Sequence, residues 1–343
     1  MIHPAVSVII PVYNKCEYIR QTIDSVLGQE FDKFELIVID DGSTDSSLQI
    51  VNEFNDSRMR VFSQVNAGVE RARNFGFSKS VGPFVVFLDA DDLMGSNRLR
   101  KQIELFNATN DLVLVGTWAS VIDPSGNTIG SIRPPTSNTA LQLAHLFRNQ
   151  FVSSSVMIKR SAIDNNDVFN ETRGKRFAED FDLWLRIARK GCVANIPEML
   201  TAYRRLNASR SQSSDSSLLE SARDISAEWL HLNTRHFKSV ASARSFVMSI
   251  NGLDDLSPSV GCNVKTSLQT YKKLIHDLSV ENSPEIPNEY RKVINQHKSH
   301  IVIWCLVGKL PIPLQRKVFS LLNRFKSSQF ASWLVAKIAM RIS

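Results

Sequence analysis

The stretch Phe84-Val85-Val86-Phe87-Leu88-Asp89-Ala90-Asp91-Asp92 joins an apolar run directly to three carboxylates. The apolar part, residues 84–88, predicts a buried strand of a parallel sheet. Open α/β sheets bind ligands at the carboxyl ends of their strands, so the aspartates fall where a ligand is expected. Hard cations such as Mg²⁺ or Mn²⁺ often bind through one or two carboxylates plus substrate phosphates. The stretch therefore favours a metal–diphosphate site, although a solvated turn with helix-capping aspartates also explains it when taken alone.

Strand-like and helix-like segments alternate through the first hundred residues. Apolar strand patterns cover residues 5–12, 34–39 and 60–63, and a helical pattern follows each of them. This alternation predicts βαβ units and a mostly parallel sheet. Right-handed crossovers place the carboxyl ends of the strands at one edge, so Tyr13, Asp41 and the three aspartates should converge. The glycine-rich phosphate fingerprints are absent, so a nucleotide would be held by carboxylates, a metal and other side chains.

The middle of the chain continues the α/β pattern. We expect a strand at 112–122, a turn at 124–127, a returning strand at 128–132, a helix at 139–149 and a strand at 152–158. A further helix begins near Glu179 and Asp180, where its macrodipole favours carboxylates, so capping alone would account for both. Trp184 in this helix is expected to be a core side chain.

Composition separates a nearly neutral body from a basic tail. The chain has 343 residues and a net charge of +7, but from Tyr290 onward it carries ten Lys or Arg and no Asp or Glu. Such asymmetry suggests an anionic partner. No run is apolar and long enough for a membrane-spanning helix, and no leader pattern is visible, so we expect a cytoplasmic protein. The four cysteines are far apart, which fits reduced, structural thiols.

Five linked motifs resemble the family 2 glycosyltransferases with the GT-A fold. They are residues 6–14, 37–45, 66–76, 87–92 and 179–186, and Tyr203-Arg204 matches the segment that usually follows. The resemblance covers about residues 5–215. It implies a Rossmann-like α/β fold with a mostly parallel central sheet flanked by helices. We expect this catalytic domain at residues 1–215 and a mainly helical C-terminal region at 216–343.

The resemblance implies a role for each matching position. Asp180 would be the general base, with Glu179 supporting its loop, and Asp91 would ligate Mn²⁺ or Mg²⁺. Other matching residues would bind the nucleotide sugar: Pro11, Tyr13, Asn14, Asp41, Asn66, Arg71, Arg73, Asp89 and Ala90. One departure is Leu206, where many members have a histidine near the diphosphate. Arg204, Arg205, Asn207 or Ser209 could take its place, or the metal is held less completely.

The function implied is transfer of a sugar, with inversion, from a nucleotide diphosphate donor to a hydroxyl. The donor is expected to be a UDP-sugar, and the acceptor a saccharide or lipid-linked molecule in cell-surface polysaccharide synthesis. The basic tail would lie on the inner membrane surface, or else cap the catalytic domain or form an oligomer contact. The alternative is an inactive nucleotide-sugar-binding module. A nucleic-acid binder is disfavoured because no recognised module is present.

Overall fold

The computed structural model describes residues 3–164, 168–169, 178–206, 216–251, 264–277 and 292–298. Its contacts divide the chain into two compact units. The first comprises Met1–Leu141 and Gln150–Leu218, and the second comprises Gln142–Asn149 and Leu219–Ser343. The short segment Gln142–Asn149 thus belongs with the second unit, although it lies within the range expected for the catalytic domain.

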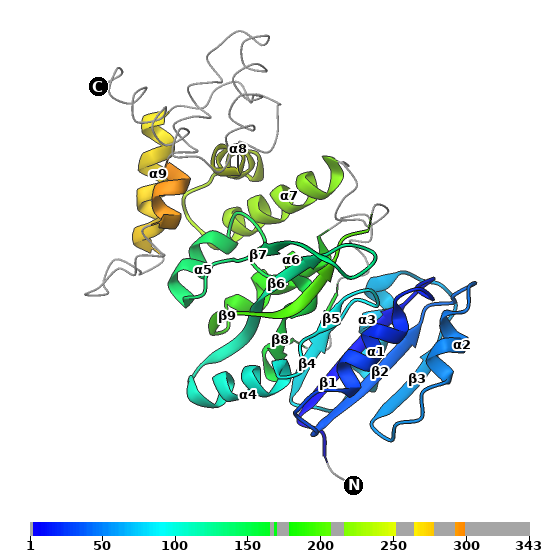
Figure 1. Cartoon of the computed structure of the whole chain (residues 1–343). Coiled ribbons are helices and arrows are strands. Elements are labelled where there is room, and N and C mark those ends of the chain that lie inside the picture. Colours follow the sequence, from blue (N-terminus) through cyan, green and yellow to red (C-terminus); the bar gives the residue numbers. More distant parts are fainter. Residues whose placement is uncertain are drawn as a thin grey trace. The chain divides into compact units, whose positions relative to one another are not determined.

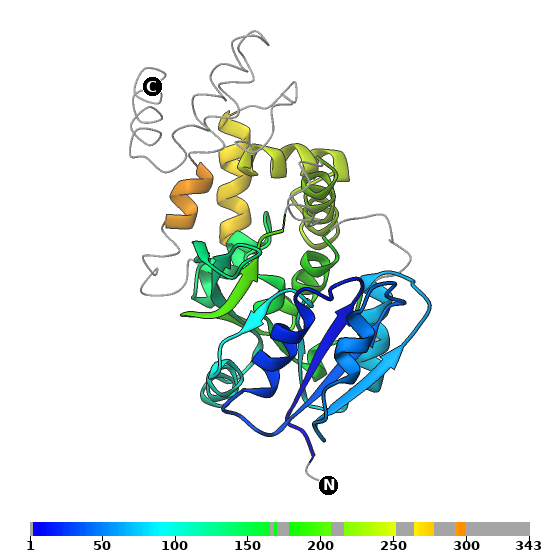
Figure 2. The same cartoon turned by 45° about the vertical axis from the view of Figure 1, so that its right-hand side comes forward.

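The first half of the sheet in the first unit is parallel. Strand β1 (Val6–Val12) pairs in parallel with β2 (Phe34–Asp40) and with β4 (Phe84–Phe87), and β2 pairs in parallel with β3 (Met59–Ser63). Figures 1 and 2 show these strands side by side in blue and cyan. All seven residues of β1 and of β2 are buried, as continuous apolar runs in a parallel sheet require.

The second half of the sheet is mixed. In the described part of the chain the strand order is β3-β2-β1-β4-β8-β6-β9-β5, with β7 paired to β6. The added strands are β5 (Leu93–Met94), β6 (Leu112–Ile122), β7 (Thr128–Ile132), β8 (Met157–Lys159) and β9 (Cys192–Arg204). The β6–β9 pair is parallel, whereas β8 runs antiparallel to β4 and β6, and β5 to β9. The predicted α/β class is confirmed, with parallel pairing concentrated at the amino-terminal half.

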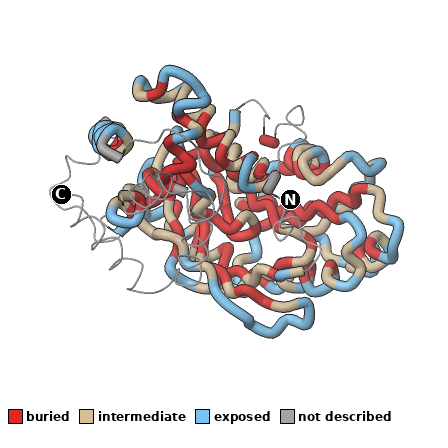
Figure 3. The backbone as a smooth tube through the Cα atoms, turned by 90° about the horizontal axis from the view of Figure 1, so that it is seen from above, coloured by how far each residue is buried: buried red, intermediate tan, exposed pale blue. Residues whose placement is uncertain are grey.

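Helices cover both faces of this sheet. They are α1 (Ile19–Leu27), α2 (Ser47–Asn52), α3 (Val69–Lys79), α4 (Arg98–Ala108) and α6 (Glu179–Ala188), and the first four residues of α5 (Asn138–His145) also belong to this unit. Because successive strand residues point to opposite faces, Val8 and Ile10 pack in one core with α1 and α4. Ile9 packs in the other core with α3 and α6, where Trp184 is fully buried as expected. Figure 3 shows the long runs of buried residues that result.

The expected strand at 152–158 begins later than predicted. Ser153–Ser155 form a 3₁₀ turn, and β8 starts only at Met157. Two of the serine hydroxyls bond to backbone N–H groups: Ser154 Oγ accepts from Asp89 and Ser155 Oγ from Thr117. Serine side chains compete with ladder hydrogen bonds in this way. The apolar residues on either side of the three serines led to the prediction of one continuous strand. Strands β5 and β9 were not predicted at all.

The second unit is helical where it is described. It contains most of α7 (Ser216–Asn233), with α8 (Val240–Asn251) and α9 (Val264–Asp277), as the helical pattern of residues 218–280 predicted. Arg244 of α8 pairs with Asp224 of α7 at 2.7 Å. The Tyr271 hydroxyl lies 2.9 Å from His297 Nδ1 inside this unit. The break expected near 252–258 and most of the basic tail lie outside the described residues. Within the described residues, no helix combines the length and apolarity needed to span a bilayer.

Candidate functional site

The turn after β4 presents three aspartates in three environments. The side chain of Asp89 is 35% exposed and that of Asp91 is 15% exposed, whereas Asp92 is buried. Burial and the charge of Asp89 raise the pKa of Asp91, although Lys15 opposes the shift. Burial, Asp89 and Asp91 likewise raise the pKa of Asp92 well above its ordinary value. This turn concentrates negative charge and therefore attracts cations.

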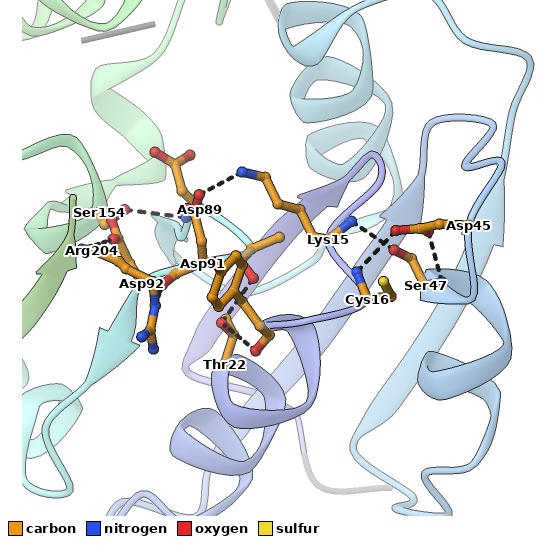
Figure 4. A network of polar contacts seen from close by, with 12 residues as sticks. Lys15, Cys16, Thr22, Asp45, Ser47, Asp89, Asp91, Asp92, Ser154 and Arg204 are labelled. Carbon is orange, nitrogen blue, oxygen red and sulfur yellow. Dashed lines mark hydrogen bonds and ion pairs between the residues drawn. The ribbon is translucent and has the colours of Figure 1, made fainter. Parts of the chain in front are cut away.

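The loop after β1 supplies a cation to that turn. Lys15 Nζ lies 2.6 Å from Asp91 Oδ2, and its backbone N–H donates to Ser47 Oγ at 2.7 Å. Figure 4 shows the lysine side chain reaching from β1 to the aspartates. Asn14, the residue before Lys15, has a left-handed φ of 51°, and its Oδ1 accepts a hydrogen bond from the Thr44 N–H at 2.8 Å. The convergence of the β1 and β4 carboxyl ends is thus confirmed.

The end of β2 organises a separate part of the edge. Asp41 accepts hydrogen bonds from the backbone N–H groups of Ala67 and Gly68, both at 2.9 Å, and from Gln64 Nε2 at 2.7 Å. The carboxylate therefore fixes the loop before α3. That loop and Arg71 line a hollow of about 250 Å³, together with Val65 and Asn66. Asp41 therefore shapes this hollow.

Arg73 connects the β4 turn with the start of α6. Its guanidinium donates to Asp89 Oδ1 at 2.7 Å and to Glu179 Oε1 at 3.1 Å, and its side chain is only 5% exposed. Burial alone lowers the pKa of Arg73, but the two carboxylates raise it above its ordinary value. This arginine is a buried link between two predicted motifs, and it lies 106 residues before Glu179 in the chain.

The first turn of α6 carries the predicted base. Ala178, just before it, has a left-handed φ of 98°, a conformation that costs an alanine roughly 1–3 kcal/mol. Asp180 Oδ1 accepts the Phe181 N–H at 2.8 Å. Burial and Glu179 raise the pKa of Asp180 to about 6, whereas Arg73 opposes the shift. A carboxyl that titrates there is suited to accept a proton near neutral pH.

Arg204 holds the aspartate turn from the end of β9. Its guanidinium donates to the carbonyl oxygens of Asp91 (2.8 Å) and Pro124 (2.9 Å) and to Gln21 Oε1 (2.9 Å). Its backbone N–H donates to Asp92 Oδ1 at 2.7 Å. The side chain is buried, so it cannot replace the family histidine at the diphosphate without breaking these bonds. Arg205 is exposed, and Asn207 and Ser209 lie outside the described residues.

The remaining predicted site residues lie close to these elements. Pro11 is buried in β1 and pairs with Ile39, and Tyr13 is 47% exposed just beyond that strand. Ala90 is buried, and its carbonyl accepts the Thr22 hydroxyl at 3.0 Å. The contacts that Lys15 and Arg204 make with the aspartate turn were not predicted from sequence. The position of Lys15 directly after a strand was a usable signal, whereas nothing local distinguishes a buried arginine from a surface one.

The acidic turn suits a divalent cation only in part. The described residues include no cluster of three or more His, Cys, Asp or Glu side chains placed to hold a metal ion. A metal bound through Asp91 would need further ligands, and the oxygens of a diphosphate are the usual ones for Mg²⁺ and Mn²⁺. The donor set therefore fits a cation that arrives with a phosphorylated substrate.

Comparison with known proteins identifies the class. The site is an acidic, arginine-linked edge of an α/β sheet, and residues 7–167 match the family model "Glycosyl transferase family 2". A relative from Haemophilus influenzae, described as an uncharacterized glycosyltransferase, is 39% identical over 163 residues. The alignment covers 47% of this chain and 64% of that protein, and a Rickettsia bellii glycosyltransferase is matched over only 28% of its length.

A second relative and a solved structure agree. The putative teichuronic acid biosynthesis glycosyltransferase TuaG of Bacillus subtilis is 32% identical over 210 residues, which cover 60% of this chain and 80% of TuaG. The crystal structure of TarS from S. aureus in complex with UDP-GlcNAc is 19% identical, with a TM-score of 0.58. It covers 86% of this chain and 90% of that one and supports the GT-A fold. The chain belongs to glycosyltransferase family 2.

Proposed function

We propose that the protein is an inverting glycosyltransferase that moves a sugar from a UDP-sugar to a hydroxyl of a saccharide or lipid-linked acceptor. The observation that carries the proposal is the Asp89–Arg73–Glu179 link. It holds the predicted donor motif beside the helix that carries the predicted base. UDP-GlcNAc in the TarS structure and the teichuronic acid biosynthesis named for TuaG support a UDP-sugar donor and a role in surface polysaccharide assembly.

Asp180 accepts the proton in this proposal. It takes the proton of the acceptor hydroxyl, whose oxygen forms a bond to the anomeric carbon on the face opposite the diphosphate. The bond from that carbon to the diphosphate oxygen breaks, and the nucleoside diphosphate leaves with the electron pair. Direct displacement from the opposite face inverts the anomeric centre. Glu179, tied to Arg73, keeps the start of α6 in place.

The donor lies along the strand ends. Asn66 and Arg71 line the hollow that would receive the nucleoside, and Asp41 fixes the loop that forms it. Asp91 would hold a Mn²⁺ or Mg²⁺ ion, which as a Lewis acid stabilises the charge of the departing diphosphate. Arg73 was expected at the diphosphate, but both of its terminal nitrogens already bond to carboxylates. We assign it the positioning of those carboxylates.

Asp180→Asn tests the assignment of the base. Transfer should fall by roughly 10²–10⁴-fold, the usual contribution of a general base. Donor binding, measured by thermal shift with UDP-sugars, should stay unchanged because the base acts on the acceptor. Asp182→Asn is the matched control, since Asp182 lies on the same helix and pairs with Arg186 at 3.1 Å. Near wild-type turnover in Asp180→Asn would overturn the assignment.

The basic tail fits a membrane-bound acceptor. We infer that residues 290–343 attach the enzyme to an anionic membrane surface, on the cytoplasmic face, where lipid-linked acceptors are presented. Each basic residue near such a surface contributes about 1 kcal/mol. Full-length protein should float with anionic liposomes at low salt, and less at 1 M salt, where the Debye length is about 3 Å. No flotation at low salt would exclude this attachment.

A further inference from the structure

The Lys15–Asp91 ion pair occupies the position at which the proposed metal would bind. Lys15 Nζ lies 2.6 Å from Asp91 Oδ2, and the two side chains are 29% and 15% exposed. An ammonium and a divalent cation cannot share one carboxylate at such distances without strong repulsion. Metal binding at Asp91 therefore requires the lysine to move.

The surrounding contacts let the side chain move without the loop. The Lys15 backbone N–H is bonded to Ser47 Oγ at 2.7 Å, and the Cys16 N–H is bonded to Asp45 Oδ2 at 3.1 Å. The loop backbone is thus fixed to the turn before α2. The four-carbon stem of lysine is flexible, and its ammonium can change partners as a point charge. A displaced ammonium at this edge needs a new anion.

We propose that Lys15 is an exchangeable counter-cation of Asp91. It neutralises the carboxylate while no donor is bound, and it passes to the donor diphosphate when a divalent cation takes over Asp91. The inference rests on the proposed function and specifies how that site is regulated. Its consequence is that metal and nucleotide bind cooperatively, because each removes one partner of the ion pair.

Mn²⁺ binding measured by electron paramagnetic resonance tests the exchange without an activity assay. In Lys15→Met without nucleotide, Mn²⁺ should bind roughly 5- to 150-fold more tightly than in wild type, the usual range of coupling between sites. UDP in EDTA should bind less tightly to the variant, because the diphosphate loses its cation. Lys15→Arg keeps a charge at Asp91 and should bind Mn²⁺ alone as wild type does.

Matched controls separate failure of this inference from failure of the proposed function. Lys101→Met removes a similarly exposed lysine that pairs with Glu198, and it should change neither affinity. If Lys15→Met binds Mn²⁺ alone no more tightly than wild type, the exchange is wrong even though the metal site stands. If wild type with UDP and Asp91→Ala with UDP bind Mn²⁺ equally, Asp91 is no ligand, and the exchange falls together with the metal assignment in the proposed function.

Discussion

Replacing Arg204 by methionine should destabilise the first unit and loosen the aspartate turn. The side chain is 2% exposed and donates to the carbonyl oxygens of Asp91, Asp123 and Pro124 and to Gln21 Oε1. Its guanidinium carbon also lies 4.9 Å from the centre of the Tyr18 ring. Methionine keeps much of the volume but donates no hydrogen bond.

The expected loss of unfolding free energy depends on which of the four acceptor oxygens water can hydrate once the arginine is gone. Pro124 and Gln21 are exposed, so their oxygens can be hydrated, and each lost bond costs about 0.5–1 kcal/mol. All of these bonds come from the charged guanidinium, but the Asp91 carbonyl lies deeper and is less easily hydrated, so loss of its bond costs about 1.5–3 kcal/mol. The ring contact adds about 0.5–1 kcal/mol. The total is about 3–6 kcal/mol, which lowers Tm by roughly 6–24 °C in a unit of this size.

Thermal and urea unfolding, followed by intrinsic tryptophan fluorescence, measure this loss. Arg204→Lys should lose about half as much, because an ammonium keeps the charge and one or two of the bonds. Arg58→Met is the control, since Arg58 bonds to the Leu27 carbonyl at 3.0 Å and lies over Phe34 at 4.5 Å, away from the site. If Arg204→Met is no less stable than Arg58→Met, Arg204 does not hold the turn.

Three further outcomes are expected. The kcat/KM should fall as pH drops below about 6, because protonated Asp180 cannot accept a proton. Arg73→Met should move this fall to higher pH, because it removes the positive charge that lowers the pKa of Asp180. Gly42→Ala should destabilise the fold more than Gly126→Ala in urea unfolding: both glycines have positive φ, but an added Cβ meets the Asn66 backbone at 2.9 Å only at Gly42. Burial lowers the pKa of His145 to about 3, so between about pH 3 and 6.5 the unfolded chain binds more protons than the folded one. Acidification through that window therefore lowers the free energy of unfolding, and His145→Asn should make this loss smaller.

The apolar pattern of the sequence was enough to predict the parallel strands and the edge of the sheet at which their carboxyl ends meet. Strands β1, β2 and β4 are short continuous apolar runs, and the crossover rule then placed Tyr13, Asp41 and the three aspartates at one edge. Strand β9 was not predicted because Pro197 and Glu198 interrupt its apolar pattern. Its register with β6 also shifts near Trp118. Such an interrupted pattern has no clear period in sequence.

The site was foreseen in its residue types more than in its contacts. Asp89, Glu179 and Arg73 were each singled out, but their joining depends on contacts over 106 residues that no spacing rule encodes. Arg204 was considered as a diphosphate contact because it lies two residues before Leu206, the position where many family members have a histidine. In the structure its guanidinium is buried and donates to carbonyl oxygens around the aspartate turn, so it is not free to contact a diphosphate.

The late position of β9 in the chain sets the shortest fragment that can be expressed. The family match stops at residue 167, but β9 (Cys192–Arg204) lies between β6 and β5 in the sheet and pairs with both. A fragment cut at that match would leave two open strand edges, which invite aggregation, and would lack α6. Crystallisation or library screening of the catalytic unit alone should therefore use fragments that extend at least through Leu206.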